Sequence, residues 1–373
     1  MKHLNPQDFK RSAPSFLPAT AVLEMTYLCN HRCEFCSCPW YSEKGFYETR
    51  TELTIKEWEK YISDLYKYGI CNIAFTGGEP LMKKGIEKVI EHAALGISEH
   101  IETFDGKLKS EMKPPKIYLL TNGKLMNENI LELCKKHSIH LSMSLPGLAS
   151  FEEHTKNSDY TNILYWFSRA KEKGVTTTAG ITVTQKNISE LFETISAALL
   201  AGCDTILLNR FMPGGRGLKY KNELTLNFCQ IEEMLDIAEN ILVTAGRYGS
   251  VGTELPKCII KTEKYKHLKV GTRCSAALDF FVVDPSGFIR VCNHSEKRLN
   301  HISDIMNLKL NPYWKTFTQK AYLPEECSDC GQNHQCDGGC REAAHIFSGR
   351  LNAIDPLFLN YDLKPNLHLR KYR

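Results

Sequence analysis

Three cysteines stand close together near the start of the chain, in the run CNHRCEFC that follows the apolar stretch AVLEMTYL. They are Cys29, Cys33 and Cys36. Thiolates are soft ligands that favour iron–sulfur clusters or zinc, and a protein-bound cubane normally takes four cysteines. A set of three therefore predicts an iron–sulfur cluster in which one iron stays open to an outside ligand. The alternative is a closed structural zinc site, in which Cys38 would be the fourth ligand.

The chain has 373 residues, enough for two or three domains of ordinary size. Its 47 basic and 43 acidic residues give a formal net charge of +4, which is too balanced to indicate a nucleic-acid partner. No apolar run reaches the ~18 residues of a membrane span, and the polar start MKHLNPQDFKRSAPS lacks the apolar core of a signal peptide. We therefore expect a soluble, cytoplasmic protein without a membrane partner. Because thiols stay reduced in that compartment, the fifteen cysteines indicate metal ligands rather than disulfides.

Strand-like and helix-like segments alternate over roughly the first two hundred residues, a pattern typical of a parallel α/β fold. One clear helix begins at a capping box formed by Thr54 and Glu57 and ends at Gly69. Six strands with helical crossovers predict a partial (β/α)6 TIM-like barrel, which places functional groups at the carboxyl ends of its strands. Charge-rich residues 96–115 interrupt the repeat as a surface insertion. The expected strands are 21–26, 72–76, 117–120, 140–145, 179–184 and 205–209.

The spacing C-x-x-x-C-x-x-C, together with Gly77, Gly78 and Glu79 directly after the second expected strand, resembles the radical S-adenosylmethionine (SAM) superfamily. In that family the open iron chelates the amino and carboxylate groups of SAM. An electron from the cluster then splits the sulfonium and yields a 5′-deoxyadenosyl radical. The resemblance implies an enzyme that abstracts hydrogen atoms, with SAM and a 4Fe–4S cluster as cofactors.

The same resemblance implies which residues contact SAM. The backbone of Gly77, Gly78 and Glu79 would lie along the methionine moiety, an approach that glycine permits. Phe35 stands where the family has an aromatic residue near the adenine, although it fits a place in the core equally well. Many relatives have S-L-D-G at the end of the fourth strand, whereas this chain has S-L-P-G and lacks the carboxylate. Polar contacts to the ribose and carboxylate of SAM are implied for Asn122, Ser142 and Ser144. The alternatives are an ordinary turn residue for Asn122 and ordinary strand positions for the two serines.

A glycine-rich loop follows the sixth expected strand and contains Arg210 and Arg216. At the open end of a barrel, an arginine can clamp a substrate carboxylate or phosphate through two parallel hydrogen bonds. The alternative for both residues is a solvated loop cation, because a single glycine-rich loop is weak evidence for a site.

Cysteines return in a second pattern beyond residue 245. Cys274 is followed by Gly287 and Cys292, and then by the run C-x2-C-x5-C-x3-C. Residues 280–292 predict a hairpin that brings the first two of these cysteines together. The whole pattern resembles the SPASM extension, a C-terminal module on maturases of sulfatases, of peptide natural products and of pyrroloquinoline quinone. Zinc is the alternative here as well, because C-x-x-C is also zinc-ribbon spacing.

The SPASM resemblance implies one or two auxiliary iron–sulfur clusters. No cysteine follows Cys340 to complete the usual ligand set. Cys258 is the tentative extra ligand of the first auxiliary cluster, and Asp337 or an exogenous ligand is a candidate for the second. An open iron would bind substrate, whereas a closed cluster would favour electron transfer. The implied ligand sets are Cys274, Cys292 and Cys340 for the first cluster, and Cys327, Cys330 and Cys336 for the second.

These observations predict a radical SAM enzyme with a small, cysteine-rich SPASM domain. The expected divisions are an N-terminal extension at 1–17, the barrel at 18–245, the auxiliary-cluster domain at 246–345 and a C-terminal tail at 346–373. By resemblance, the enzyme would oxidise, crosslink or epimerise a peptide or protein side chain, and the auxiliary clusters would handle the electron. The alternatives are an enzyme that modifies a small molecule or tetrapyrrole and, more distantly, a zinc-binding protein without catalytic activity.

The resemblance also implies partners. A reductant such as flavodoxin or ferredoxin would supply the electron. Only about twenty residues precede the first expected strand, too few for the leader-peptide domain of many peptide maturases. If the substrate is a peptide, we expect a separate leader-binding protein to present it.

Overall fold

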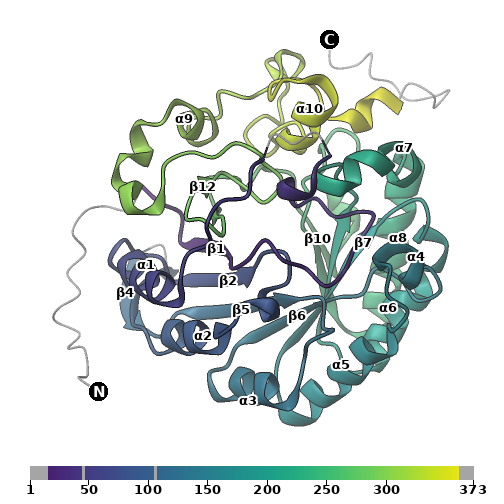
Figure 1. Cartoon of the computed structure of the whole chain (residues 1–373). Helices are drawn as coiled ribbons and strands as arrows, with labels where there is room; N and C mark the ends of the chain where they lie inside the picture. The colour runs from purple at the N-terminus through teal and green to yellow at the C-terminus, as the bar shows by residue number, and fades with distance from the viewer. Residues whose placement is uncertain (1–15, 44–46, 105–106, 361–373) are drawn as a thin grey trace.

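The computed structural model describes residues 16–43, 47–104 and 107–360, and its centre is one ten-stranded sheet (Figure 1). The strand order is β10-β9-β8-β7-β6-β5-β2-β1-β11-β12. Every neighbouring pair is parallel except β11 and β12, which are antiparallel. The predicted α/β class is confirmed. The strands are β1 (Thr20–Glu24), β2 (Asn72–Thr76), β5 (Lys116–Thr121), β6 (His140–Ser144), β7 (Thr177–Val183), β8 (Thr205–Arg210), β9 (Tyr248–Val251), β10 (Leu268–Val270), β11 (Phe280–Val283) and β12 (Ile289–Arg290).

The six strands β1, β2, β5, β6, β7 and β8 form the partial barrel, and each one overlaps an expected segment. Their side chains alternate between two faces, because successive residues of a strand point in opposite directions. On the inner face, Val22 and Ala74 form a small apolar cluster with Val282 of β11. On the outer face, Leu23 and Phe75 are fully buried in the main core.

Helices cover the outer face of the barrel, and Figure 1 shows α2, α3, α5 and α6 around its rim. Helix α1 begins at the predicted capping box, in which Thr54 Oγ1 accepts a hydrogen bond from Glu57 N and Thr54 N donates to Glu57 Oε2. None of the helices within the described ranges is both long and apolar enough to cross a lipid bilayer. The helices are α1 (Ile55–Lys67), α2 (Ile86–Ala94), α3 (Glu128–Lys136), α4 (Phe151–Thr155), α5 (Thr161–Lys173), α6 (Leu191–Leu200), α7 (Lys221–Leu224), α8 (Phe228–Ala245), α9 (Pro312–Thr318) and α10 (Arg341–Ser348).

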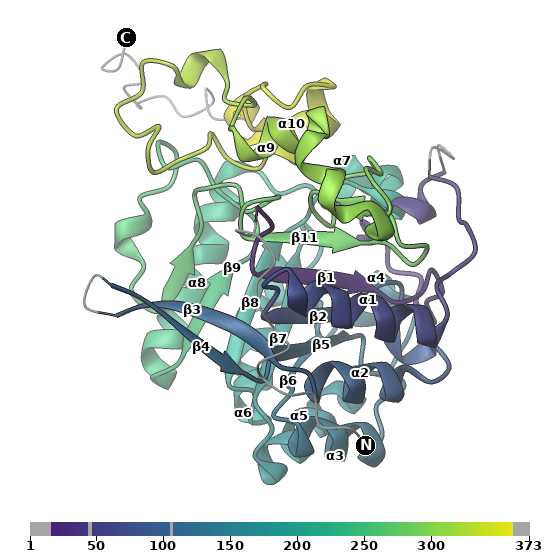
Figure 2. The same cartoon turned by 90° about the vertical axis from the view of Figure 1, so that its left-hand side faces the viewer.

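The predicted insertion forms a separate antiparallel hairpin (Figure 2). Strand β3 (Ser98–Phe104) pairs with β4 (Lys107–Lys113) in a sheet of their own. Strand β2 pairs directly with β5 across this interruption. The insertion therefore leaves the strand order of the barrel intact.

The last third of the chain extends the barrel sheet at both edges. Strands β9 and β10 continue it beyond β8, and the predicted hairpin β11–β12 continues it beyond β1. Arg290 of this hairpin forms a fully buried ion pair with Glu24 at the end of β1. Asp284, in the hairpin turn, accepts hydrogen bonds from Tyr47 Oη at 2.5 Å and Arg298 Nε at 2.7 Å. Backbone pairing and buried charge thus join the two parts of the chain, and we keep residue 245, the last residue of α8, as their proposed boundary.

Candidate active site

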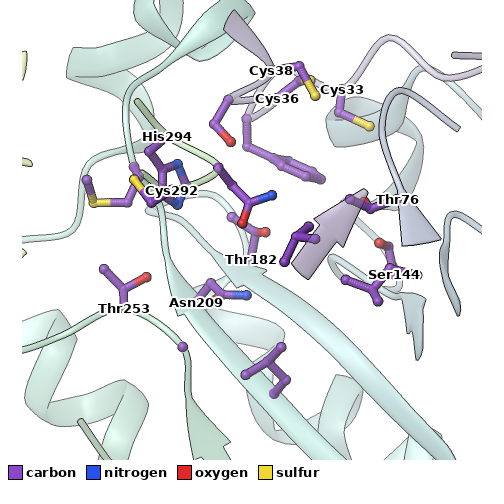
Figure 3. Close-up of a pocket in the computed structure, with 18 of the residues that line it drawn as sticks. Cys33, Cys36, Cys38, Thr76, Ser144, Thr182, Asn209, Thr253, Cys292 and His294 are labelled. Atoms are coloured by element: carbon purple, nitrogen blue, oxygen red, sulfur yellow. The ribbon is translucent and has the colours of Figure 1, made fainter. Parts of the chain in front are cut away.

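One cavity of about 700 Å³ lies at the carboxyl ends of the barrel strands, and cysteines of both patterns line it (Figure 3). Figure 3 shows Cys33, Cys36 and Cys38 on one side of the space and Cys292 with His294 on another. The cavity unites residues that are far apart in the sequence, because the last strands pair with the first strand of the barrel. The cysteines that line it are Cys29, Cys33, Cys36 and Cys38 from the N-terminal loop, and Cys274, Cys292 and Cys340 from the C-terminal region.

The glycine pair after β2 supports the N-terminal cysteine loop directly. Gly78 N donates to Thr26 O at 2.8 Å, and Glu79 N donates to Leu28 O at 2.7 Å. A Cβ atom on Gly78 would lie only 2.1 Å from the carbonyl oxygen of Leu28. Glycine is therefore required here by contact between two backbones of the chain, in addition to any contact with SAM. Gly77, Gly78 and Glu79 all line the cavity, as the resemblance implied.

The glycine-rich loop after β8 supports the cysteine loop from the other side. Gly217 N donates to Cys36 O at 3.0 Å, and a Cβ atom on Gly215 would lie 2.2 Å from Cys38 O. Arg216 Nη1 donates to Cys33 O at 3.1 Å, and its guanidinium lies 4.7 Å from the ring centroid of Tyr41. Arg216 is not among the residues that line the cavity, and its guanidinium contacts the cysteine loop, so the structure does not support its interpretation as a substrate clamp, which stays untested.

The thiols of the N-terminal loop perturb one another. Burial raises the pKa of Cys29 to about 11 and raises that of Cys33 well above its usual value. A hydrogen bond from Cys38 lowers the pKa of Cys36 to about 7, and the Cys38 thiol also lies 3.7 Å from Gly77 O. Grouped, buried thiolates repel one another unless a cation neutralises them. The donor set therefore fits a cationic metal cluster, and the Cys38 thiol makes local hydrogen bonds instead of standing free.

Glu79 is 1% exposed, and its carboxylate is occupied by hydrogen bonds within the protein. It accepts from Thr121 Oγ1 at 2.7 Å, Asn122 N at 2.8 Å and Leu81 N at 3.1 Å. Burial raises its pKa against these hydrogen bonds. The Asn122 side chain reaches the cysteine loop, donating to Asn30 Oδ1 at 2.7 Å. Glu79 thus fixes the ends of β2 and β5 relative to each other beside the cysteines.

The remaining implied SAM contacts divide into two groups. Phe35 and Ser144 line the cavity together with Asn122, whereas Ser142 is absent from the lining within the described residues. Sequence reasoning missed several polar residues that also line it. Their position at the carboxyl ends of strands could have identified them from the sequence, because functional groups of a barrel lie at these ends. The missed residues are Thr76, Thr182, Asn209, Thr253 and Glu254.

Arg210 lines the cavity, but the interpretation of its side chain as a free substrate clamp is also corrected. Its Nη1 and Nη2 atoms donate to the two carboxylate oxygens of Asp355 at 3.0 and 2.5 Å. Both side chains are buried, and Asp355 also accepts from Cys340 N at 2.9 Å. Arg210 therefore ties the end of β8 to one of the cavity cysteines. Asp355, within the expected C-terminal tail, was not anticipated.

The structure changes the grouping of the remaining C-terminal ligands. The backbone N of Lys257 donates to Cys336 Sγ at 3.4 Å, so Cys258 lies beside the expected second cluster rather than the first. Burial, followed by the charges of Cys336, Cys327 and Cys330, raises the pKa of the Cys258 thiol to about 12.

Asp337 directly follows Cys336, but its carboxylate contacts the backbone of Cys274 in the other cysteine group. One of its oxygens accepts from Cys274 N at 2.8 Å and from Tyr322 Oη at 3.2 Å, and the other accepts from Lys320 Nζ at 2.6 Å. Packing between distant segments thus places Cys258 and the Asp337 carboxylate near other cysteines than the sequence suggested, and both ligand assignments stay predictions.

Two polar side chains, the partly buried His294 and the buried Glu342, also line the cavity from the C-terminal region. His294 Nδ1 and Glu342 Oε1 have no hydrogen-bond partner within the described part of the chain. Burial lowers the pKa of His294, which keeps its imidazole neutral. Buried polar atoms are rarely left unpaired in native proteins, so these two atoms are suited to meeting a bound group.

Comparison with known proteins gives matches over most of the chain. The sequence pattern of the Radical SAM superfamily matches residues 23–198. The PqqA peptide cyclase of Rhodopseudomonas palustris is 22% identical over 361 residues, covering 91% of this chain and 86% of that protein. The PqqA peptide cyclase of Bradyrhizobium diazoefficiens is 22% identical over 360 residues with the same coverage.

Two solved structures share the fold. SuiB of Streptococcus suis bound to S-adenosylmethionine aligns with a TM-score of 0.67 at 15% identity, covering 91% of this chain and 76% of that chain. Native anSMEcpe with bound AdoMet aligns with a TM-score of 0.68 at 17% identity, covering 92% of this chain and 95% of that chain. The barrel and its C-terminal extension are thus an arrangement found in both structures.

Proposed function

Because residues 23–198 form a radical SAM domain, we propose that this enzyme cleaves SAM reductively and abstracts a hydrogen atom from a peptide or protein side chain. The outcome is oxidation, crosslinking or epimerisation of that side chain. The observation that carries the proposal is the meeting of two cysteine groups, one from each end of the chain, at a single cavity. Electron donation at one side and electron uptake at the other would both take place beside the same substrate.

The residues of the N-terminal loop have distinct roles in this proposal. Cys29, Cys33 and Cys36 hold a 4Fe–4S cluster, and when bound this cluster and SAM supply the electron and the 5′-deoxyadenosyl radical. The backbone of Gly77 and Gly78 lies where it can follow the methionine of SAM. Glu79, Asn122, Phe35 and Ser144 complete the proposed SAM site, with Glu79 acting through the residues that it holds.

The C-terminal cysteines have a second role. Cys274, Cys292 and Cys340 hold an auxiliary iron–sulfur cluster at the cavity, and Cys327, Cys330 and Cys336 belong to another. Two clusters fit an oxidation of the substrate radical, because the released electron needs an acceptor. A flavodoxin or ferredoxin of the cytoplasm serves as the external redox partner.

A peptide substrate is supported by what the similar proteins are called. The curated relatives are PqqA peptide cyclases, SuiB has been solved with its precursor peptide SuiA, and anSMEcpe has been solved with the Cp18Cys peptide. The names of these similar proteins give no such support to the alternative of a small-molecule or tetrapyrrole substrate. The cavity is of the size that takes a side chain together with a bound nucleoside.

The test is anaerobic incubation of the purified enzyme with SAM, dithionite and candidate peptides or tetrapyrroles. We expect 5′-deoxyadenosine in the enzyme reaction and none in the Cys29→Ala/Cys33→Ala/Cys36→Ala variant. Cys229→Ala, at an exposed helix position, is the matched control and should behave like the wild type. Undiminished 5′-deoxyadenosine from the triple variant, or zinc in place of iron in the purified protein, would reject the proposal.

The products separate the substrate classes. A peptide that loses a pair of hydrogen atoms has been crosslinked or oxidised. A peptide that keeps its mass in H2O but gains one deuterium when the reaction is run in D2O has been epimerised. A mass change confined to the tetrapyrroles would favour the alternative substrate class instead.

A further inference from the structure

Cys258 stands apart from every cysteine motif in the sequence, yet the fold brings it to one of them. It follows Lys257, whose backbone N donates to Cys336 Sγ at 3.4 Å. The Lys257 side chain also reaches Gln335, with Nζ donating to Oε1 at 2.5 Å. Residues 257–258 therefore lie against the segment that carries Cys336.

The neighbouring backbone fixes this placement. Thr272 Oγ1 donates to Gln335 O at 2.7 Å, and Asp337 N donates to Thr272 O at 3.0 Å. The segment around Cys336 is thus held by the chain that leads from Cys258 to Cys274. The two cysteines have different neighbours: the charges of Cys336, Cys327 and Cys330 act on the Cys258 thiol, whereas Cys274 lines the cavity.

The C-x-x-C side holds three further thiols. Cys327 and Cys330 belong to one turn, in which Cys330 N donates to Cys327 O at 3.2 Å. Cys336 Sγ accepts from Gly338 N at 3.4 Å in addition to Lys257 N. With Cys258 the group contains four thiols, the number that closes an iron–sulfur cubane. The four lie outside the cavity lining, whereas Cys274, Cys292 and Cys340 lie within it.

We propose that Cys258 is the fourth ligand of the second auxiliary cluster, which is thereby closed by four cysteines, while the cavity-side cluster keeps three. This inference rests on the proposed function, since it requires iron–sulfur clusters in the C-terminal region. It replaces the ligand that the usual SPASM pattern places after the four-cysteine run and that this chain lacks. The two clusters then have different roles. The closed cluster transfers electrons, and the three-cysteine cluster has one iron that is open to the substrate cavity.

The first test counts iron and acid-labile sulfide. In the Cys29→Ala/Cys33→Ala/Cys36→Ala background, the remaining iron belongs to the auxiliary clusters, about eight atoms per chain if both are cubanes. Because three cysteines can also hold a cluster, adding Cys258→Ala should either remove about half of that iron or change the EPR signal of one dithionite-reduced auxiliary cluster, as should Cys330→Ala, while Cys229→Ala should do neither. Full iron together with an unchanged EPR signal after Cys258→Ala would overturn the assignment. A background without iron would overturn the proposed function of the C-terminal region as well, and zinc in this group would do the same.

The second test needs no variant and therefore does not depend on how a variant folds. Cys258 is an exposed residue, as is Cys229, but burial raises the pKa of the Cys258 thiol. Its alkylation by iodoacetamide is therefore compared at alkaline pH before and after removal of iron, with Cys229 as the internal control. In the anaerobic, iron-loaded enzyme we expect mass spectrometry to find Cys229 alkylated and Cys258 protected. Removal of iron with a chelator should then expose Cys258. Equal alkylation of the two thiols in the loaded enzyme would overturn the proposal.

Discussion

The two cysteine regions of this molecule are built in opposite ways. The N-terminal ligands come from one loop of eight residues, and glycine-containing segments after β2 and β8 press on its backbone from two sides. The C-terminal cysteines come from segments between residues 258 and 340, and each group depends on contacts between distant parts of the chain. A ligand set confined to one loop is visible in the sequence, whereas a set assembled by the fold is not.

The difference extends to what supports each region. The N-terminal loop is fixed by backbone contacts that leave no space for a side chain. The C-terminal region is fixed by buried charges, including Arg290 with Glu24 and Arg210 with Asp355. Steric and electrostatic changes should therefore affect the two regions differently.

The largest effect is expected from Gly78→Ala. The added Cβ would lie 2.1 Å from Leu28 O, and because both partners are backbone the cysteine loop must shift. A misplacement of about 1 Å in a catalytic arrangement costs on the order of 100-fold in rate, so 5′-deoxyadenosine formation should fall by about that factor. Gly271→Ala is the control, since its Cβ would meet no atom closer than 3.9 Å. Equal rates of 5′-deoxyadenosine formation in the two variants would show that the cysteine loop accommodates the added Cβ atom without loss of activity.

The next effect is expected from Arg290→Met, which leaves Glu24 buried without its partner. Breaking a buried pair costs about 3–5 kcal/mol of the free energy of unfolding, measurable by anaerobic urea denaturation. Arg169→Met breaks an exposed pair with Glu128 and should cost less than about 1 kcal/mol. If both variants lose the same stability, the buried pair does not join the two parts of the chain.

The Arg290→Met variant should also depend on pH. Burial already raises the pKa of Glu24, and loss of Arg290 raises it further. A carboxyl whose pKa is higher in the folded state binds protons more tightly there, so its contribution is present at pH values below its ordinary value and lost as pH rises. The deficit relative to the wild type should therefore grow from acidic toward neutral pH.

A smaller loss is expected from Asp355→Asn. The amide keeps an acceptor for Cys340 N but removes the charge that faces Arg210, a change worth about 2–3 kcal/mol. The loss should appear in thermal unfolding and as reduced iron at the cavity-side cluster. The N-terminal cluster should be unaffected. An Asp355→Asn variant with less iron on Cys29, Cys33 and Cys36 would therefore contradict the separation of the two regions.

The smallest effect is expected from Cys38→Ala. Its thiol makes weak local hydrogen bonds, each worth about 1 kcal/mol, so 5′-deoxyadenosine formation should change by less than about tenfold. The iron content should stay at the wild-type level, in contrast to Cys36→Ala. Loss of the N-terminal cluster from Cys38→Ala would mean that four side chains hold that cluster. No iron would then stay open to SAM.

Sequence reasoning was most successful where the signal is local. The capping box of Thr54 and Glu57 and all six barrel strands are present, because helix caps and strand alternation depend on residues close together in the chain. Gly77 and Gly78 were recognised as a pair that needs close backbone approach, although the partner backbone, at Thr26 to Leu28, came only from the structure.

The errors share one physical cause. Arg210 was interpreted as a free cation, but its partner Asp355 lies 145 residues further along the chain. Cys258 was paired with Cys274 because they are near in sequence, whereas packing brings it to Cys336. A charge or a thiol carries no mark of the distant residue that will neutralise or accompany it, so these pairings need the three-dimensional fold.

The pairing of β1 with β11 has a consequence for synthesis of the protein. Thr20 of β1 pairs with Phe280 of β11. At about 5–20 residues per second, β1 leaves the ribosome some tens of seconds before β11 is made. Throughout that interval β1 is an open edge, able to pair with another nascent chain, and the carboxylate of Glu24 has no arginine. Expression at lowered temperature together with chaperones, and full-length rather than truncated versions, should therefore give the highest yield of intact enzyme.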